Sequence, residues 1–217
     1  MNHTGNRLEI QRSLMEKGHL FKLICGAGNE DANEVYKLCF VYTLAGANSI
    51  DMSANIDVVK SAVKGVKDAE KILNEKQNEG YTRPYLTVSI GMPGDHHVRK
   101  AKIIDKKCTE CDACIPVCPT DAIPDILTII EDRCIGCGAC GVACQDDAIG
   151  YSHKEIEIES VLKECIDLGV ENIELHASVI ADDPVLHEWE IVNKINPNGF
   201  NSVCIDRGYL SNHALQI

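Results

Sequence analysis

The chain has 217 residues, 12 of which are cysteine, and its formal net charge is −12. A chain of this length buries a core without cross-links, whereas cysteine-dense disulfide scaffolds are usually short and secreted. The first residues, MNHTGNRLEI, contain no apolar signal segment, and no stretch approaches the ~18 apolar residues of a membrane span. We therefore expect a cytoplasmic protein without a membrane span, in which clustered cysteines bind metal rather than form disulfides.

The charge balance is acidic, with 33 Asp and Glu residues against 21 Lys and Arg residues. A chain without a basic stripe is a poor binder of nucleic acids and of anionic membranes. We expect a protein partner of the acidic surface to present a basic patch. Acidic residues that serve only solubility would give the same balance.

The first part of the chain alternates between strand-like and helix-like patterns. Short apolar runs at 20–28, 48–55 and 83–91 predict buried strands, and apolar residues at helical spacing predict helices at 29–47 and 56–76. The order of strand, helix, strand, helix, strand is typical of parallel strands in an α/β architecture.

The same alternation resumes after a cysteine-rich insert. Helices are predicted at 154–170 and 182–199, and strands at 172–178 and 200–211. The flanks supply about five strands, whereas a closed β/α barrel has eight and needs ~250 residues. We therefore expect a partial or open (β/α)-barrel-like domain, or a chain shorter than the complete domain. The predicted division is a first part of the β/α domain at 1–102, a ferredoxin-type module at 103–151 and a continuation of the β/α domain at 152–217.

The insert contains an internal repeat with eight of the twelve cysteines. Residues 106–123 (KKCTECDACIPVCPTDAI) align with 132–149 (DRCIGCGACGVACQDDAI) at a constant offset of 26. Each copy has the spacing C-x2-C-x2-C-x3-C, which is the run of bacterial two-cluster ferredoxins. Pro119 follows the last cysteine of the first copy, but Gln145 stands at that place in the second, which departs from the pattern.

This spacing predicts two [4Fe-4S] clusters with crossed ligation. Three cysteines two residues apart wrap around three irons, and the fourth cysteine points to the other cluster. Zinc needs four ligands and rarely uses the additional cysteines at this spacing, so zinc and disulfides are the weaker alternatives. One cluster is assigned to Cys108, Cys111, Cys114 and Cys144, and the other to Cys134, Cys137, Cys140 and Cys118.

Several weaker signals lie near predicted strand ends. The segment from Gly26 to Asp31 has two glycines of a dinucleotide fingerprint, but an ordinary turn before a helix is the stronger interpretation because Asp31 would repel pyrophosphate. Asp51 is a candidate functional residue at a strand end, with a capping or loop aspartate as the favoured alternative. Lys22 could project to the same edge, although a lone lysine is more often exposed.

Two further segments are candidates for ligand contacts. His97 or Arg99, beside His96 in the loop before the insert, could contact a ligand or tie down the insert. The segment 206–208 (Asp-Arg-Gly) follows the apolar run VCI and is a candidate for ligand contact as well. The remaining four cysteines are expected to act as small buried hydrophobic residues. They are Cys25, Cys39, Cys165 and Cys204. Cys25 and Cys204, which lie near strand ends, could also have a weak redox role.

Three strings outside the repeat resemble the light-dependent period protein family (LdpA): LFKLICGAGNED, VYTLAGANSIDMSAN and RPYLTVSIGMPGDHHVRKAK. The family is associated with cyanobacterial circadian input. The resemblance implies a β/α-barrel-like domain that carries a two-cluster ferredoxin module and reports cellular redox state to a regulatory partner. The eight motif cysteines are the residues that carry over.

Two clusters favour electron transfer or redox sensing, with a ferredoxin or a quinol as the electron donor. The alternative is an oxidoreductase whose β/α domain binds a flavin or a substrate and uses the module as an electron relay. Clusters with only a structural role are a third possibility. A flavin released on denaturation would distinguish the enzyme from the sensor.

Overall fold

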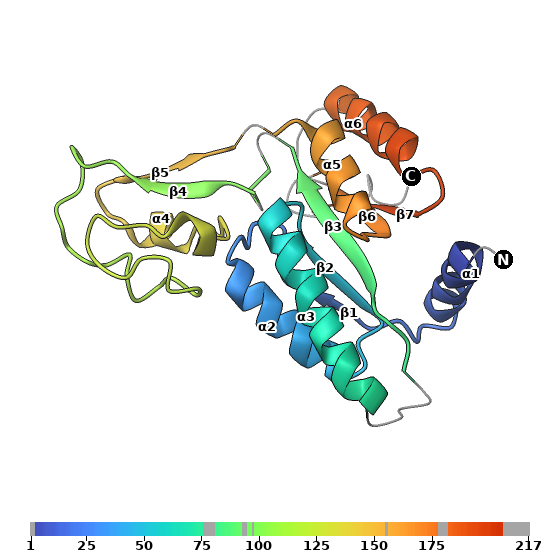
Figure 1. Ribbon diagram of the computed structural model, residues 1–217. Helices are drawn as coiled ribbons and strands as arrows, with labels where there is room; N and C mark the ends of the chain where they lie inside the picture. The colour runs from blue at the N-terminus through green and yellow to red at the C-terminus, as the bar shows by residue number, and fades with distance from the viewer. Residues whose placement is uncertain are drawn as a thin grey trace.

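The computed structural model contains an open, five-stranded parallel sheet (Figure 1). Its strands lie side by side in chain order: β1 (Lys22–Ile24), β2 (Ser49–Ser53), β3 (Tyr85–Gly91), β6 (Asn172–His176) and β7 (Phe200–Cys204). The predicted α/β class and parallel strands are confirmed, and the described strands do not close into a barrel. The residues that the structure describes are 3–75, 81–92, 95–96, 98–154, 156–177 and 182–205.

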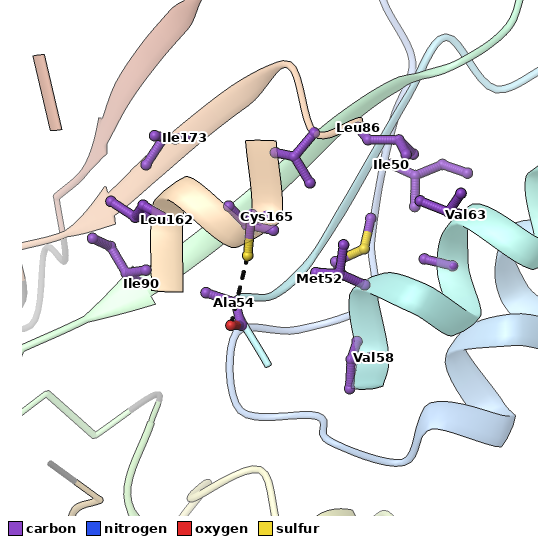
Figure 2. Close-up of a cluster of buried hydrophobic side chains, with 14 of the residues drawn as sticks. Ile50, Met52, Ala54, Val58, Val63, Leu86, Ile90, Leu162, Cys165 and Ile173 are labelled. Atoms are coloured by element: carbon purple, nitrogen blue, oxygen red, sulfur yellow. Dashed lines mark hydrogen bonds between the residues drawn. The ribbon is translucent and has the colours of Figure 1, made fainter. Parts of the chain in front are cut away.

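Four helices pack on one face of this sheet: α2 (Ala32–Leu44), α3 (Ile56–Glu75), α5 (Ile158–Asp167) and α6 (Asp182–Ile195). The reason lies in the period-two alternation of the strands, which sends every second residue to the helical side. Figure 2 shows this core, in which the Cys165 thiol donates to the carbonyl oxygen of Ala54 at 3.8 Å. The side chains that meet there include Ile50, Met52, Leu86, Ile90, Leu162 and Ile173.

The opposite face of the sheet is polar, and we call it the polar face. The alternate residues of β2, β3 and β6 are apolar toward the helices and polar on this side. Most of these polar side chains are nevertheless buried. Buried polar groups need partners, and the polar face supplies them through hydrogen bonds and ion pairs between neighbouring strands. Its main members are Lys22, Ser49, Asp51, Thr87, Ser89, Asn172, Glu174, His176 and Ser202.

An N-terminal helix, α1 (His3–Glu16), lies at the edge where the strands begin (Figure 1). The guanidinium of Arg7 binds both oxygens of Glu171, at 2.6 and 3.0 Å, and lies 4.3 Å over the ring of Tyr85. Tyr85 in turn donates its hydroxyl to the carbonyl of Arg7 at 2.7 Å. These contacts attach the helix to the start of β3 and to the residue before β6.

The cysteine repeat lies at the opposite edge, where the strands end (Figure 1). Its base is an antiparallel ribbon of β4 (Lys100–Ile103) and β5 (Ile149–Ser152), in which Lys100 pairs with Ser152. Between these strands the chain forms only a 3-10 turn, Glu131–Arg133, and the short helix α4 (Ala139–Ala143). No helix within the described ranges has both the length and the hydrophobicity that crossing a membrane requires.

Candidate iron–sulfur centres

The eight repeat cysteines gather in two groups of four around two separate small cavities. Each group takes three cysteines from one copy of the repeat and the fourth from the other copy. Four thiol sulfurs around one space are the donor set that iron–sulfur clusters use. The first cavity is lined by Cys108, Cys111, Cys114 and Cys144, and the second by Cys118, Cys134, Cys137 and Cys140.

Backbone N–H groups point at the sulfurs at equivalent places in the two copies. Ala122 donates to Cys118 Sγ and Ala148 donates to Cys144 Sγ, both at 3.2 Å. Ala101, on β4, donates to Cys134 Sγ at 3.3 Å. Hydrogen bonds of this kind stabilise thiolate charge and set the potentials of clusters that thiolates hold.

The balance of these effects is clearest at Cys118. Burial raises the pKa of its thiol, but hydrogen bonds from Thr120 and from the backbone of Ala122 and Ile123 outweigh burial. The pKa therefore lies below the ordinary value for a thiol, which favours the ligating, deprotonated form.

The two copies also share an uncommon backbone conformation. Glu110 and Gly136, which are 26 residues apart, have positive φ angles of 59° and 68°. Only the second copy uses glycine, and the reason is packing. A Cβ atom on Gly136 would lie 2.4 Å from the carbonyl oxygen of His96 and 2.6 Å from that of Arg99. The second copy is therefore pressed against the loop that follows β3.

Lys100 attaches the module to the sheet through buried polar contacts. Its ammonium donates to the carbonyl of Gly28 at 2.6 Å and to the carbonyl of Cys134 at 2.8 Å, and it lies 3.3 Å from the carboxylate of Glu30. Burial raises the pKa of Glu30, but a hydrogen bond from Asn55 and the charge of Lys100 outweigh burial, so the pKa lies below its usual value and Glu30 is ionised. The result is a paired buried charge beside a cysteine of the second group.

Further contacts strengthen this attachment. The guanidinium of Arg99 donates to the carbonyl of Gly136 at 3.0 Å and lies 3.9 Å over the ring of Tyr151. Arg99 therefore ties down the insert, which is one of the two roles predicted for it. The loop before α2 contributes an N–H bond from Glu30 to the carbonyl of Asp132 at 2.9 Å.

Comparison with known proteins agrees with this geometry. The 4Fe-4S binding domain family matches residues 101–123 and 127–150, one match for each copy of the repeat. The chain is 37% identical over 167 residues, 76% of its length, to the protein "Light dependent period A" of Synechococcus elongatus (strain ATCC 33912 / PCC 7942 / FACHB-805). The chain is an iron–sulfur protein related to light dependent period A. The resemblance predicted from the sequence is confirmed.

The match to light dependent period A covers 46% of that protein, so the chain spans about half the length of the curated relative that it matches. No solved structure matches this one. The relationship therefore rests on sequence, and the geometry of the two cysteine groups comes from the present structure.

A cavity of about 590 Å³ lies between the module and the ends of the strands. Ser53 and Asn55 after β2, Ser89 and Gly91 of β3, and Lys100 of the module line part of it. The cavity borders the Lys100–Cys134 contact, so its contents would lie beside the second cysteine group. No sequence pattern predicted this cavity, because its walls come from both flanks and the insert.

The polar face corrects two predictions. Asp51 is neither a helix cap nor a loop residue: it lies in the middle of β2, almost fully buried, and binds Lys22 at 2.9 Å and Ser89 at 2.6 Å. Lys22 is not a lone exposed lysine, because it also binds Glu174 at 2.7 Å. Burial raises the pKa of Asp51 to about 6, although Lys22 and Ser89 both favour its carboxylate.

The remaining predictions have mixed outcomes. Asp31 caps α2 by accepting from the N–H groups of Asn33 and Glu34, so the Gly26–Asp31 segment is an ordinary turn before a helix. His97 and the segment 206–208 lie outside the described residues.

Of the four scattered cysteines, Cys39 and Cys165 are buried in the core as predicted. Cys25 is only partly buried. Cys204 is likewise only partly buried, and it departs from the prediction more strongly because its sulfur lies beside Glu174 and His176 on the polar face. The prediction failed there because an apolar neighbourhood in sequence, SVCI, does not reveal which face of the strand the cysteine takes.

Proposed function

We propose that the chain binds two [4Fe-4S] clusters with crossed ligation and exchanges electrons through them. The observation that carries this proposal is the pair of four-cysteine cavities, each of which takes one cysteine from the opposite copy of the repeat. When bound, each cluster would supply a one-electron carrier. The chain's own contribution is to hold eight sulfurs in place, to donate N–H groups to them and to exclude water from Cys134 and Cys140, which are buried.

The exposed side of the module supports exchange with an external redox partner. Cys111 and Cys137, at equivalent places in the two copies, are the exposed member of each group. Val142, between Cys140 and Cys144, is 91% exposed. An exposed apolar residue beside a cluster ligand suits a transient contact with an electron donor, either a protein such as a ferredoxin or a quinol.

The resemblance to the light-dependent period protein family adds the proposal that the clusters report redox state to a regulatory partner of the circadian type. The acidic surface of the chain would favour a basic face on such a protein.

The proposal is tested by iron and sulfide analysis of anaerobically purified protein, where about eight of each per chain are expected for two cubes. Crossed ligation makes a sharper prediction for double variants. Cys108→Ala with Cys144→Ala should remove one cluster and leave about four irons, whereas Cys108→Ala with Cys118→Ala should damage both. The reverse result would show that each copy holds its own cluster. Stoichiometric zinc in place of iron would refute the cluster assignment.

A second candidate function is an oxidoreductase that binds a flavin or a substrate in the cavity between the sheet and the module. Its volume of about 590 Å³ lies within the usual range for small-molecule sites. Its place at the carboxyl ends of parallel strands is where β/α enzymes bind ligands. Release of a stoichiometric flavin on denaturation would favour this function, whereas full cluster content without any organic cofactor would favour electron transfer or sensing.

A further inference from the structure

Three potential metal ligands converge on the polar face, far from the cysteine repeat in sequence. They are the carboxylate of Glu174, the imidazole of His176 and the thiol of Cys204, whose ligand atoms all lie within 4.8 Å of one another. Glu174 Oε1 and His176 Nε2 are 3.7 Å apart. The group lies at the ends of β6 and β7, where the two strands approach the carboxyl edge of the sheet.

The sheet itself builds this arrangement. His176 and Cys204 are register partners on the neighbouring parallel strands, and Glu174 stands two residues before His176. Because side chains alternate between faces with a period of two, Glu174 and His176 must share a face, and the register adds Cys204 to it. The convergence therefore follows from strand pairing and not from a flexible loop.

We propose that Glu174, His176 and Cys204 bind a zinc ion. Thiolate, imidazole and carboxylate are the three ligand types that zinc uses in proteins, and this mixed set is unsuited to calcium or magnesium. Ligand atoms around a tetrahedral zinc ion lie roughly 3.3–3.6 Å apart. The Glu174–His176 separation exceeds this by only a few tenths of an ångström. Three protein ligands leave a fourth position for water or a substrate oxygen.

A carboxylate also stands close to the histidine of the trio. His176 Nδ1 lies 3.7 Å from Asp95 Oδ2, so a fully buried carboxylate faces the nitrogen that would not contact the ion. Such a carboxylate behind a ligating histidine fixes its tautomer and orientation. Lys22 and Ser202 both bind Glu174 Oε2, at 2.7 and 3.0 Å, which leaves Oε1 directed toward His176.

The charges around the trio also favour a dication. Asp51, Asp95 and Glu174 supply three carboxylates, and a thiolate at Cys204 would add a fourth negative charge. Among the residues that the structure describes, Lys22 faces them and binds Asp51 and Glu174. These carboxylates would attract a zinc ion, and two of them, Asp51 and Asp95, are almost fully buried.

The test is a zinc titration of cluster-loaded, anaerobic protein in competition with a chromophoric chelator, with iron measured on the same samples. We expect one zinc per chain with a dissociation constant below about 1 µM. Cys204→Ser and His176→Gln should each weaken binding by at least about 100-fold, and Asp95→Asn by about 10- to 100-fold, at unchanged iron content. Cobalt should give visible thiolate-dependent bands that disappear in Cys204→Ser.

Cys25→Ser is the matched control, because Cys25 is also partly buried and follows the edge strand β1 of the same sheet. This variant should bind zinc as the unaltered chain does, and Cys204→His should retain binding because it replaces one donor by another. Two results would overturn the proposal. One is that the unaltered, cluster-loaded protein binds no zinc. The other is equal uptake by the Cys204→Ser/His176→Gln double variant, which would place the zinc on other thiols.

Discussion

The ammonium of Lys100 lies 2.8 Å from the carbonyl oxygen of Cys134 and 3.3 Å from the carboxylate of Glu30. One buried cation thus links the sheet to the second cysteine group. Replacing Lys100 by Met leaves the partly buried Glu30 without its positive partner and removes the donor to the carbonyls of Gly28 and Cys134, so we expect the free energy of unfolding to fall by about 3 kcal/mol. The lost positive charge should also lower the reduction potential of the neighbouring cluster, since that charge favours the reduced form.

Urea unfolding and a reductive titration followed by EPR measure the two effects. The control is Lys60→Met, which removes an exposed pair with Glu164 at 3.7 Å on the helical side. Exposed pairs contribute little, so this change should cost less than about 0.5 kcal/mol and leave the potentials unaltered. Equal effects of the two variants would argue against a special role for Lys100.

The repeat offers a matched pair of backbone positions. Gly136→Ala places a Cβ against the carbonyls of His96 and Arg99 and strains a positive φ angle, so we expect the second cluster to be lost or its iron to dissociate faster. Glu110 has the same backbone conformation and already carries a side chain. Glu110→Ala should therefore retain eight irons, and Glu110→Gly should stabilise the chain by up to about 1 kcal/mol. Iron content after gel filtration is the measurement.

The attachment of α1 depends on Arg7. Arg7→Ala removes a two-pronged contact with Glu171 and the cation–π contact with Tyr85, and we expect it to cost about 2 kcal/mol. Arg7→Lys keeps the charge but loses the fork geometry, so it should recover only part of that stability. Limited proteolysis near residue 17 should be faster in both variants than in the unaltered protein. It should be faster in Arg7→Ala than in Arg7→Lys. Unchanged proteolysis would show that α1 is held by other contacts.

The thiol of Cys165 should be unreactive in the folded protein. Burial raises its pKa to about 12, and its sulfur donates to Ala54 inside the core. The folded state therefore retains a proton that the unfolded state loses between pH 9 and 12, so this residue lowers stability as the pH rises through that range. Alkylation at pH 8 followed by mass spectrometry should label Cys165 only after unfolding in urea. Cys25, which is partly exposed, should be labelled in the native protein.

The sequence was most informative where chemistry depends on local spacing. The cysteine repeat and the alternating helices and strands are patterns within short windows, and both have the predicted places in the structure. The strands β4 (KAKI) and β5 (IGYS) escaped prediction because neither begins with an apolar run like the one that revealed β1. The helix α1 gave no clear amphipathic signal, and its attachment to Glu171 depends on a residue 164 positions away.

The polar face shows why the rest could not be predicted. The alternation in SIDMS places Asp51 opposite Ile50 and Met52, but its partner Lys22 is 29 residues away, and Glu174 is 152 residues from that lysine. No local window contains all three. The same reason hides the convergence of His176 and Cys204, which depends on the register of two strands. Residues that meet only across a parallel sheet need the sheet before they can be seen together.

The ribbon of β4 and β5 has a consequence for how the sheet assembles. Strand β3 ends at Gly91 and its neighbour β6 begins at Asn172, so an unstructured connection would close a loop of about 80 residues. Pairing of Lys100 with Ser152 shortens the effective connection to about 27 residues, which reduces the entropy cost of closure by roughly 1 kcal/mol. Insertion of clusters, by ordering the ribbon, would thus speed the joining of the two halves of the sheet. Iron supply would therefore influence the folding rate of the α/β domain, although the eight repeat cysteines lie outside that domain.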